Sequence, residues 1–103
     1  MIDIRYELRN GAHDLSIIGH AGYAAHGEDI VCAGVSSLVY ALVGFIVSRD
    51  EEPTSDISMG EGYAYITCST SADIDTAFEM ACIGFEQIAN THPANVSYSN
   101  TSQ

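Results

Sequence analysis

A long stretch without any charged side chain, from Ile30 to Ser48, most constrains the fold of this chain. It is nearly long enough to cross a membrane as a helix. However, polar serines and two glycines interrupt it, and the acidic residues around it lack the Lys/Arg bias that orients a membrane span. Asp29 precedes it and is a good helix N-cap. We therefore predict a buried central helix and no membrane segment.

The segments on either side of this helix have the patterns of strands and of a second helix. Apolar and polar residues alternate strictly from Ile2 to Arg9, and the following Asn10-Gly11 pair is a strong turn signal. The acid-rich helix pattern after residue 71 keeps its apolar residues on one face and ends at Pro93. We predict strands over 2–9, 15–20, 57–59, 63–68 and 96–98, and helices over 30–48 and from about 72 to 92.

The predicted order is β-β-α-β-β-α-β, which is typical of an α+β domain with two helices on a mostly antiparallel sheet. No repeat or linker divides residues 1–103, so we expect a single domain. The first helix is too apolar for a two-layer monomer with one open face. Either the sheet curls around it or a second copy covers it, and we favour a homodimer.

Charge and cysteine content limit the partners and the compartment. Three Arg and no Lys oppose fourteen acidic residues, which gives a net charge of −11. Such a surface repels phosphate, so we expect no direct nucleic acid binding. The negative charge suits a basic partner, and it equally serves to keep the protein soluble. Three cysteines and an N-terminus without a signal pattern argue against a disulfide scaffold and favour the cytoplasm.

His20 and Cys32 are the side chains best placed for chemistry. Cys32 falls in the first turn of the predicted helix, where unpaired N–H groups and the helix dipole favour a thiolate and could hold an oxyanion. His20, at a strand end, could accept the thiol proton. From the residues alone the question stays open, because Cys32 also suits a buried position and His20 a structural hydrogen bond.

A signature surrounds these two residues: Gly19-His20-Ala21, a short glycine-containing loop, and then the run from Gly27 to Ser36, Gly-Glu-Asp-Ile-Val-Cys-Ala-Gly-Val-Ser. It closely resembles the Prp family, the ribosomal-processing cysteine proteases. The resemblance implies removal of a short N-terminal extension from ribosomal protein bL27 by a homodimer, at a hydrophobic motif with paired aromatics. It further implies that Cys32 is the nucleophile, that His20 is the general base, and that the loop 21–28 orders over substrate.

Other signature residues have two interpretations each. Asp29 either caps the helix or orients the imidazole, with capping slightly favoured. Ser36, one turn after Cys32, either contacts substrate or donates a hydrogen bond to the Cys32 carbonyl. Gly22 and Gly27 are candidate substrate-binding positions in the loop.

Outside this set, His26 is a weaker candidate base, and His13 is expected in the first hairpin turn without a motif around it. We expect no cofactor. A zinc site of His20, His26 and Cys32 lacks the paired ligand spacing of known zinc motifs. Two alternatives to this protease remain: a non-catalytic acidic module that holds a basic ribosomal protein, and a Prp-like protease whose substrate differs.

Overall fold

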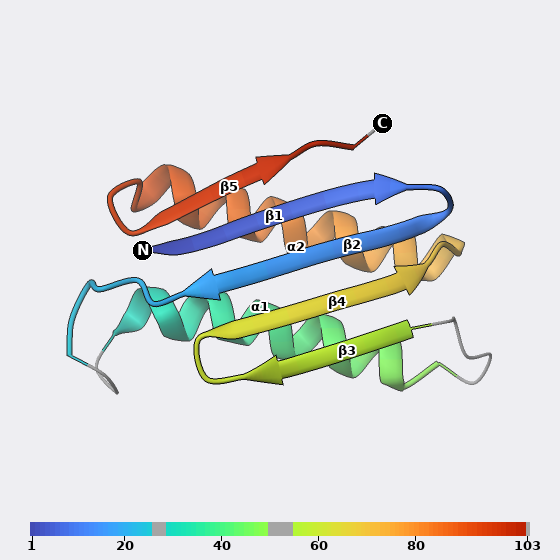
Figure 1. Ribbon diagram of the computed structural model, residues 1–103, viewed down its shortest axis with the longest axis horizontal. Helices are drawn as coiled ribbons and strands as arrows, with labels where there is room; N and C mark the ends of the chain where they lie inside the picture. The colour runs from blue at the N-terminus through green and yellow to red at the C-terminus, as the bar shows by residue number, and fades with distance from the viewer. Residues whose placement is uncertain (26–28, 50–54, 103) are drawn as a thin grey trace.

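Five strands and two helices follow one another in the predicted order. The structure, a computed structural model, describes residues 1–25, 29–49 and 55–102. Figure 1 shows the elements in place. They are β1 (Ile2–Arg9), β2 (Ala12–Gly19), α1 (Ile30–Val47), β3 (Ser55–Gly60), β4 (Tyr63–Ser69), α2 (Ala72–Thr91) and β5 (Val96–Asn100).

The strands form one sheet in the order β3-β4-β2-β1-β5. Only the pair of β1 and β5 is parallel, so the predicted mostly antiparallel sheet is confirmed. The second strand begins at Ala12 rather than at Leu15. The reason is the tightness of the turn: Asn10 and Gly11 both have positive φ, 56° and 76°, and Arg9 already pairs with Ala12.

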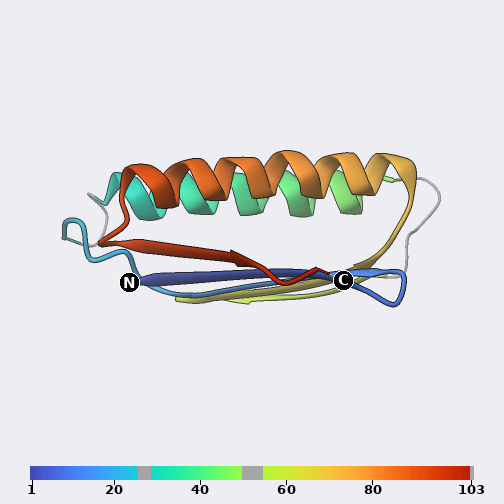
Figure 2. The same cartoon turned by 90° about the horizontal axis from the view of Figure 1, so that it is seen from above.

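The domain has two layers, with both helices on the same face of the sheet and the other face uncovered (Figure 2). The strand residues that point to the helices form the core, and Ile4, Leu15 and Ile66 are completely buried there. From the helix side, Phe78 and Phe85 of α2 are equally buried. The amphipathic pattern predicted for this helix is thus confirmed.

His13 does not lie in the hairpin turn, as expected, but inside β2, because the turn has only two residues. Its ring is buried and stacks on Phe78. Burial raises the pKa of Tyr6 to about 12, and the Tyr6 hydroxyl forms a hydrogen bond with His13 Nδ1 at 2.6 Å. His13 Nε2 donates to Asp75 Oδ1 at 2.7 Å, which ties β2 to α2.

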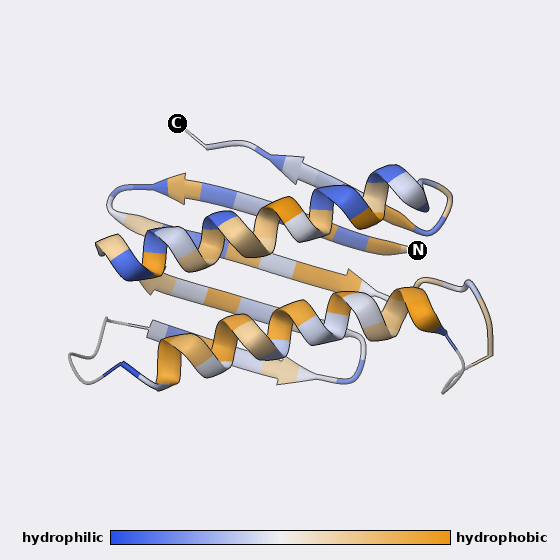
Figure 3. Cartoon of the chain, turned by 180° about the vertical axis from the view of Figure 1, so that it is seen from behind, coloured by the Kyte–Doolittle hydropathy of each residue, from blue (hydrophilic) through white to orange (hydrophobic). Residues whose placement is uncertain are grey.

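Helix α1 lies in the outer layer and is not the buried central helix that we predicted. One side of it packs on the sheet, through Val31, Val35, Val39, Leu42 and Ile46. The sheet does not curl around it, so apolar side chains such as Ile30, Tyr40 and Val47 stay about two-thirds exposed. Its apolar character is visible along its length in Figure 3. By length and composition alone, this one helix of the described chain could cross a membrane.

Candidate active site

His20 directly follows β2, at a point where the backbone is closely packed. Gly19 has a φ of +107°, which L side chains rarely adopt, and a Cβ there would lie 2.2 Å from the carbonyl oxygen of Met1. The Gly19 N–H donates to the Gly62 carbonyl at 2.8 Å. His20 is therefore held between the start of β1 and the β3–β4 turn, and glycine is required in front of it.

Asp29 caps α1 and orders the segment before Cys32. Its Oδ1 accepts the N–H groups of Val31 and Cys32 at 3.0 and 2.9 Å, and its Oδ2 accepts the N–H of Tyr23 at 3.0 Å. These backbone donors, led by Cys32, hold the pKa of Asp29 below its usual value. Because both oxygens are engaged by the backbone, the geometry supports the capping interpretation over the orienting one.

The same bonds change the expectation for an oxyanion site. The N–H groups of Val31 and Cys32 donate to the Asp29 side chain, and the N–H of Ala33 donates to the Asp29 carbonyl at 3.0 Å. The amides of Val31, Cys32 and Ala33, which we expected to hold an oxyanion, therefore already have acceptors. A donor to the Cys32 sulfur can instead come from another segment.

One such donor is the Ala21 N–H, which points at Cys32 Sγ from 3.2 Å. Cys32 is half-buried, whereas Cys68 and Cys82 are buried. Burial raises the pKa of the Cys68 and Cys82 thiols, which keeps both protonated at neutral pH. Among the three thiols, Cys32 alone combines partial exposure with a backbone donor, the combination that suits a nucleophile.

Two adjoining clefts, of about 290 and 490 Å³, open beside Cys32. Both are lined by His20, Cys32, Ser36 and Glu61. The larger one extends over the loop before α1, and the smaller one runs between α1 and the strands. The walls of the smaller cleft are largely apolar and include Ile2, Ile17, Val35, Val39, Tyr40, Met59 and Tyr63.

The structure brings together most of the residues singled out from the sequence. His20, Cys32 and Ser36 share both clefts, and Gly22 and Asp29 line the larger one. Ser36 makes no hydrogen bond within the described residues; its neighbour Ser37 donates to the Ala33 carbonyl instead. Contact with substrate thus remains the prediction for Ser36. Gly27 and His26 lie outside the described residues, as does the end of the 21–28 loop.

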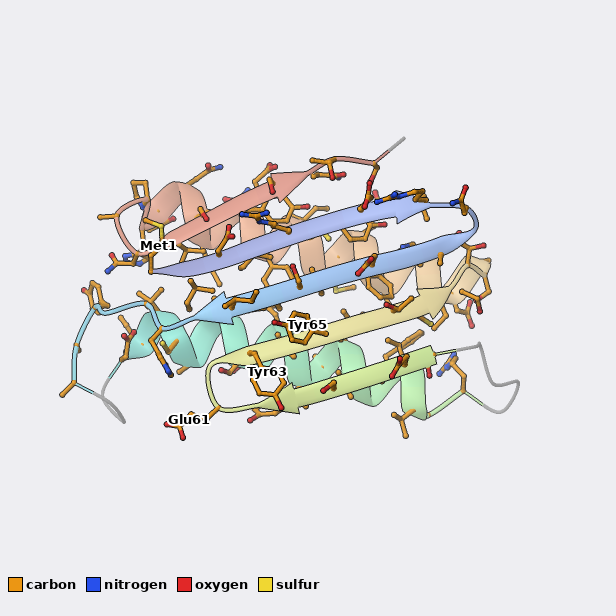
Figure 4. All side chains as sticks on the ribbon, viewed as in Figure 1. Met1, Glu61, Tyr63 and Tyr65 are labelled. Atoms are coloured by element: carbon orange, nitrogen blue, oxygen red, sulfur yellow. The ribbon has the colours of Figure 1, made fainter. Side chains whose placement is uncertain are left out.

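The β3–β4 turn contributes residues that the sequence analysis did not assign to the site. Glu61 lines both clefts, and Figure 4 shows it at the tip of the β3–β4 hairpin, with Tyr63 and Tyr65 beside one another on the sheet. A Cβ at Gly62 would lie 3.1 Å from His20 Nε2, so the imidazole packs directly on the Gly62 backbone. The turn itself was predicted, but its place beside His20 follows from the pairing of β2 with β4.

Over residues 1–25, 29–49 and 55–102, no three His, Cys, Asp or Glu side chains are grouped as metal ligands. The alternative site of His20, His26 and Cys32 includes a residue outside that range.

Comparison with known proteins identifies the family. The sequence profile described as cysteine protease Prp matches residues 1–97. This chain belongs to the Prp family. The family membership and the enzyme class predicted from the signature, cysteine protease, are both confirmed.

Individual Prp relatives resemble the chain over most of its length. The ribosomal processing cysteine protease Prp of Bacillus subtilis is 39% identical over 71 residues, which cover 68% of this chain and 63% of that protein. The protein of the same name from Mycoplasma genitalium is 26% identical over 78 residues, 76% of this chain and 78% of that protein.

Solved structures share the fold. An essential ribosomal processing protease Prp from S. aureus, in complex with a covalently linked product peptide, superposes with a TM-score of 0.88 at 21% identity. The superposition covers 98% of this chain and all of that one. A Streptococcus mutans protein superposes with a TM-score of 0.75 at 28% identity, over 100% of this chain and 96% of that one. The predicted α+β architecture is therefore that of Prp structures.

Proposed function

We propose that this chain is a cysteine endopeptidase that removes the N-terminal extension of ribosomal protein bL27 in the cytoplasm. The observation that carries the proposal is the shared location of His20 and Cys32. Both line the same two clefts, and the Cys32 sulfur already accepts a backbone N–H. The names of the relatives, ribosomal processing cysteine proteases, support a ribosomal substrate.

The proposed reaction follows from these two side chains. His20 accepts the proton of the Cys32 thiol, and the thiolate attacks the carbonyl carbon of the scissile bond. The C–N bond then breaks as His20 returns its proton to the leaving amine, which leaves the extension as a thioester on Cys32. Water, deprotonated by His20, attacks this thioester; the C–S bond breaks, and the proton goes back to the Cys32 sulfur.

Charge and cleft chemistry support the same substrate class. A net charge of −11 attracts a basic ribosomal protein over long range, an effect that salt weakens. The smaller cleft is largely apolar and lies beside Cys32, which suits a hydrophobic cleavage motif. The rate at which enzyme and substrate meet would thus depend on charge. The choice of the peptide bond to be cut would depend on the cleft.

We expect the wild-type chain to cut bL27 that carries an N-terminal extension, and the Cys32→Ala variant to leave it intact. Mass spectrometry of the products reads the cut and its position. Cys82→Ala is the matched control, because it removes a thiol that is buried on α2 and lines neither cleft. It should cut like the wild type.

The same samples test the competing functions. Cys32→Ala should still bind extended bL27 at low salt in a titration calorimeter, because binding does not need the nucleophile. If the wild type binds bL27 without cutting it, the acidic binding module replaces the protease. If it neither binds nor cuts bL27, the substrate is a different one.

We also propose a homodimer, on the observation that apolar side chains of α1 remain exposed. Ile30, Tyr40 and Val47 are 65, 67 and 72% exposed, and the sheet does not cover them. Burial of such a face against a second copy is favourable, at about 25 cal/mol per Å². Sedimentation equilibrium should give a mass of twice 11.0 kDa; a monomer at micromolar concentration would rule the dimer out.

A further inference from the structure

The backbone of Ala21 is held by hydrogen bonds on both its N–H and its carbonyl. Its N–H donates to Cys32 Sγ at 3.2 Å, and its carbonyl accepts the side-chain amide of Asn95 at 2.9 Å. Ala21 is only 3% exposed, so water does not readily replace either bond. A residue far away in the sequence thus contacts the segment between His20 and the loop.

Asn95 is itself firmly placed. It lies in the turn between α2 and β5, where its N–H donates to the His92 carbonyl at 3.0 Å. Its own carbonyl accepts the Ile2 N–H, at the start of β1, at 2.8 Å. Because the Asn95 backbone is bonded at two points, its side chain is directed at Ala21 and has little freedom to move.

The Ala21 N–H donates to the Cys32 sulfur, whereas three amides in the first turn of α1 do not. The N–H groups of Val31, Cys32 and Ala33 are bonded to Asp29, as described above. Ala21 therefore supplies a donor to the sulfur from outside that helix. A hydrogen bond to an anion is stronger than one to a neutral group, so this donor favours the thiolate over the thiol.

We propose that Asn95 is a positioning residue, which holds the Ala21 N–H toward the Cys32 sulfur and so favours the reactive thiolate. It acts through Ala21 and need not touch the sulfur or the substrate. The inference rests on the proposed function only where it concerns proteolysis. The effect of Asn95 on the Cys32 sulfur can be measured without any peptide.

The test compares Asn95→Asp with the wild type by alkylation of Cys32 with iodoacetamide across pH. A carboxylate has nearly the shape of the amide but cannot donate to the Ala21 carbonyl. We expect the alkylation rate at pH 7 to fall about tenfold and its half-maximal pH to rise by about one unit, as for one weakened bond to a charged group. The value of kcat for peptide cleavage should fall similarly, with KM little changed.

Asn90→Asp is the matched control, because it makes the same change at an exposed position of α2 without a side-chain hydrogen bond among the described residues. The other titratable groups at the clefts, which are His20, Asp29, Tyr40, Glu61 and Tyr63, are unchanged in both variants. Asn95→Ala is the second variant; it removes the donor without adding a charge and should shift the profile in the same direction. All rates are taken below the melting temperature of each variant.

The outcomes separate the possible roles. A lower melting temperature with an unchanged alkylation profile and kcat would mean that Asn95 is only structural, and would overturn the proposal. A shifted alkylation profile in a protein whose wild type does not cleave bL27 would support the positioning role while the proposed function fails.

Discussion

Replacement of Gly19 by alanine should lower the free energy of unfolding by roughly 3 kcal/mol, from backbone strain and overpacking together. The φ of +107° is unfavourable for any L side chain, and the new Cβ would lie 2.2 Å from the Met1 carbonyl oxygen. That oxygen belongs to the backbone and cannot rotate away as a side chain does. The start of β1 would have to move, and with it the Ile2 pairing to Gly19.

Urea unfolding followed by circular dichroism measures this loss, and Gly11→Ala is its control. Gly11 also has a positive φ, +76°, but nothing lies within 4 Å of its missing Cβ. Alanine there should cost only about 1 kcal/mol, the backbone part of the effect. Equal losses in the two variants would show that close packing against Met1 is not what requires glycine at this signature position.

His20→Gln should lower kcat/KM for peptide cleavage about 100- to 10,000-fold, the range that a general base contributes. Glutamine retains hydrogen-bonding capacity but cannot accept and return the proton. His92→Gln is the matched control, because His92 ends α2 and lines neither cleft. Its ring meets Tyr23 edge-on at 5.3 Å, so the most we expect from its loss is a small effect on the loop. Near-normal turnover in His20→Gln would mean that another group is the base.

The position of the imidazole can be tested without removing it. In Gly62→Ala the added Cβ would lie 3.1 Å from His20 Nε2, and the backbone φ of +80° would be strained. Gly11→Ala again controls for the strain alone. We expect Gly62→Ala to reduce kcat about tenfold, a loss typical of a small displacement of a catalytic group, while Gly11→Ala does not. Equal kcat values would show that the contact with Gly62 does not position His20.

The local elements of this fold were predictable because their signals are local. Strict alternation over residues 2–9 and the Asn10-Gly11 turn specify the first hairpin, and Asp29 specifies the start of α1. Two of the errors concern this same hairpin. β2 begins earlier than predicted, and His13 lies inside it, because a two-residue turn leaves no room for a loop.

The sequence by itself determined the order of the strands and helices, since periodicity, capping and turn residues act over a few positions. His20 and Cys32 were assigned by the resemblance of the residues around them to the Prp family. Only the tertiary structure decided which segments surround that pair. Glu61 and Gly62 lie beside it because β4 pairs with β2. Asn95 contacts Ala21, next to His20, because β5 pairs with β1. Such pairings depend on which apolar faces are buried together, and neither a residue's neighbours in sequence nor its own preferences contain that information.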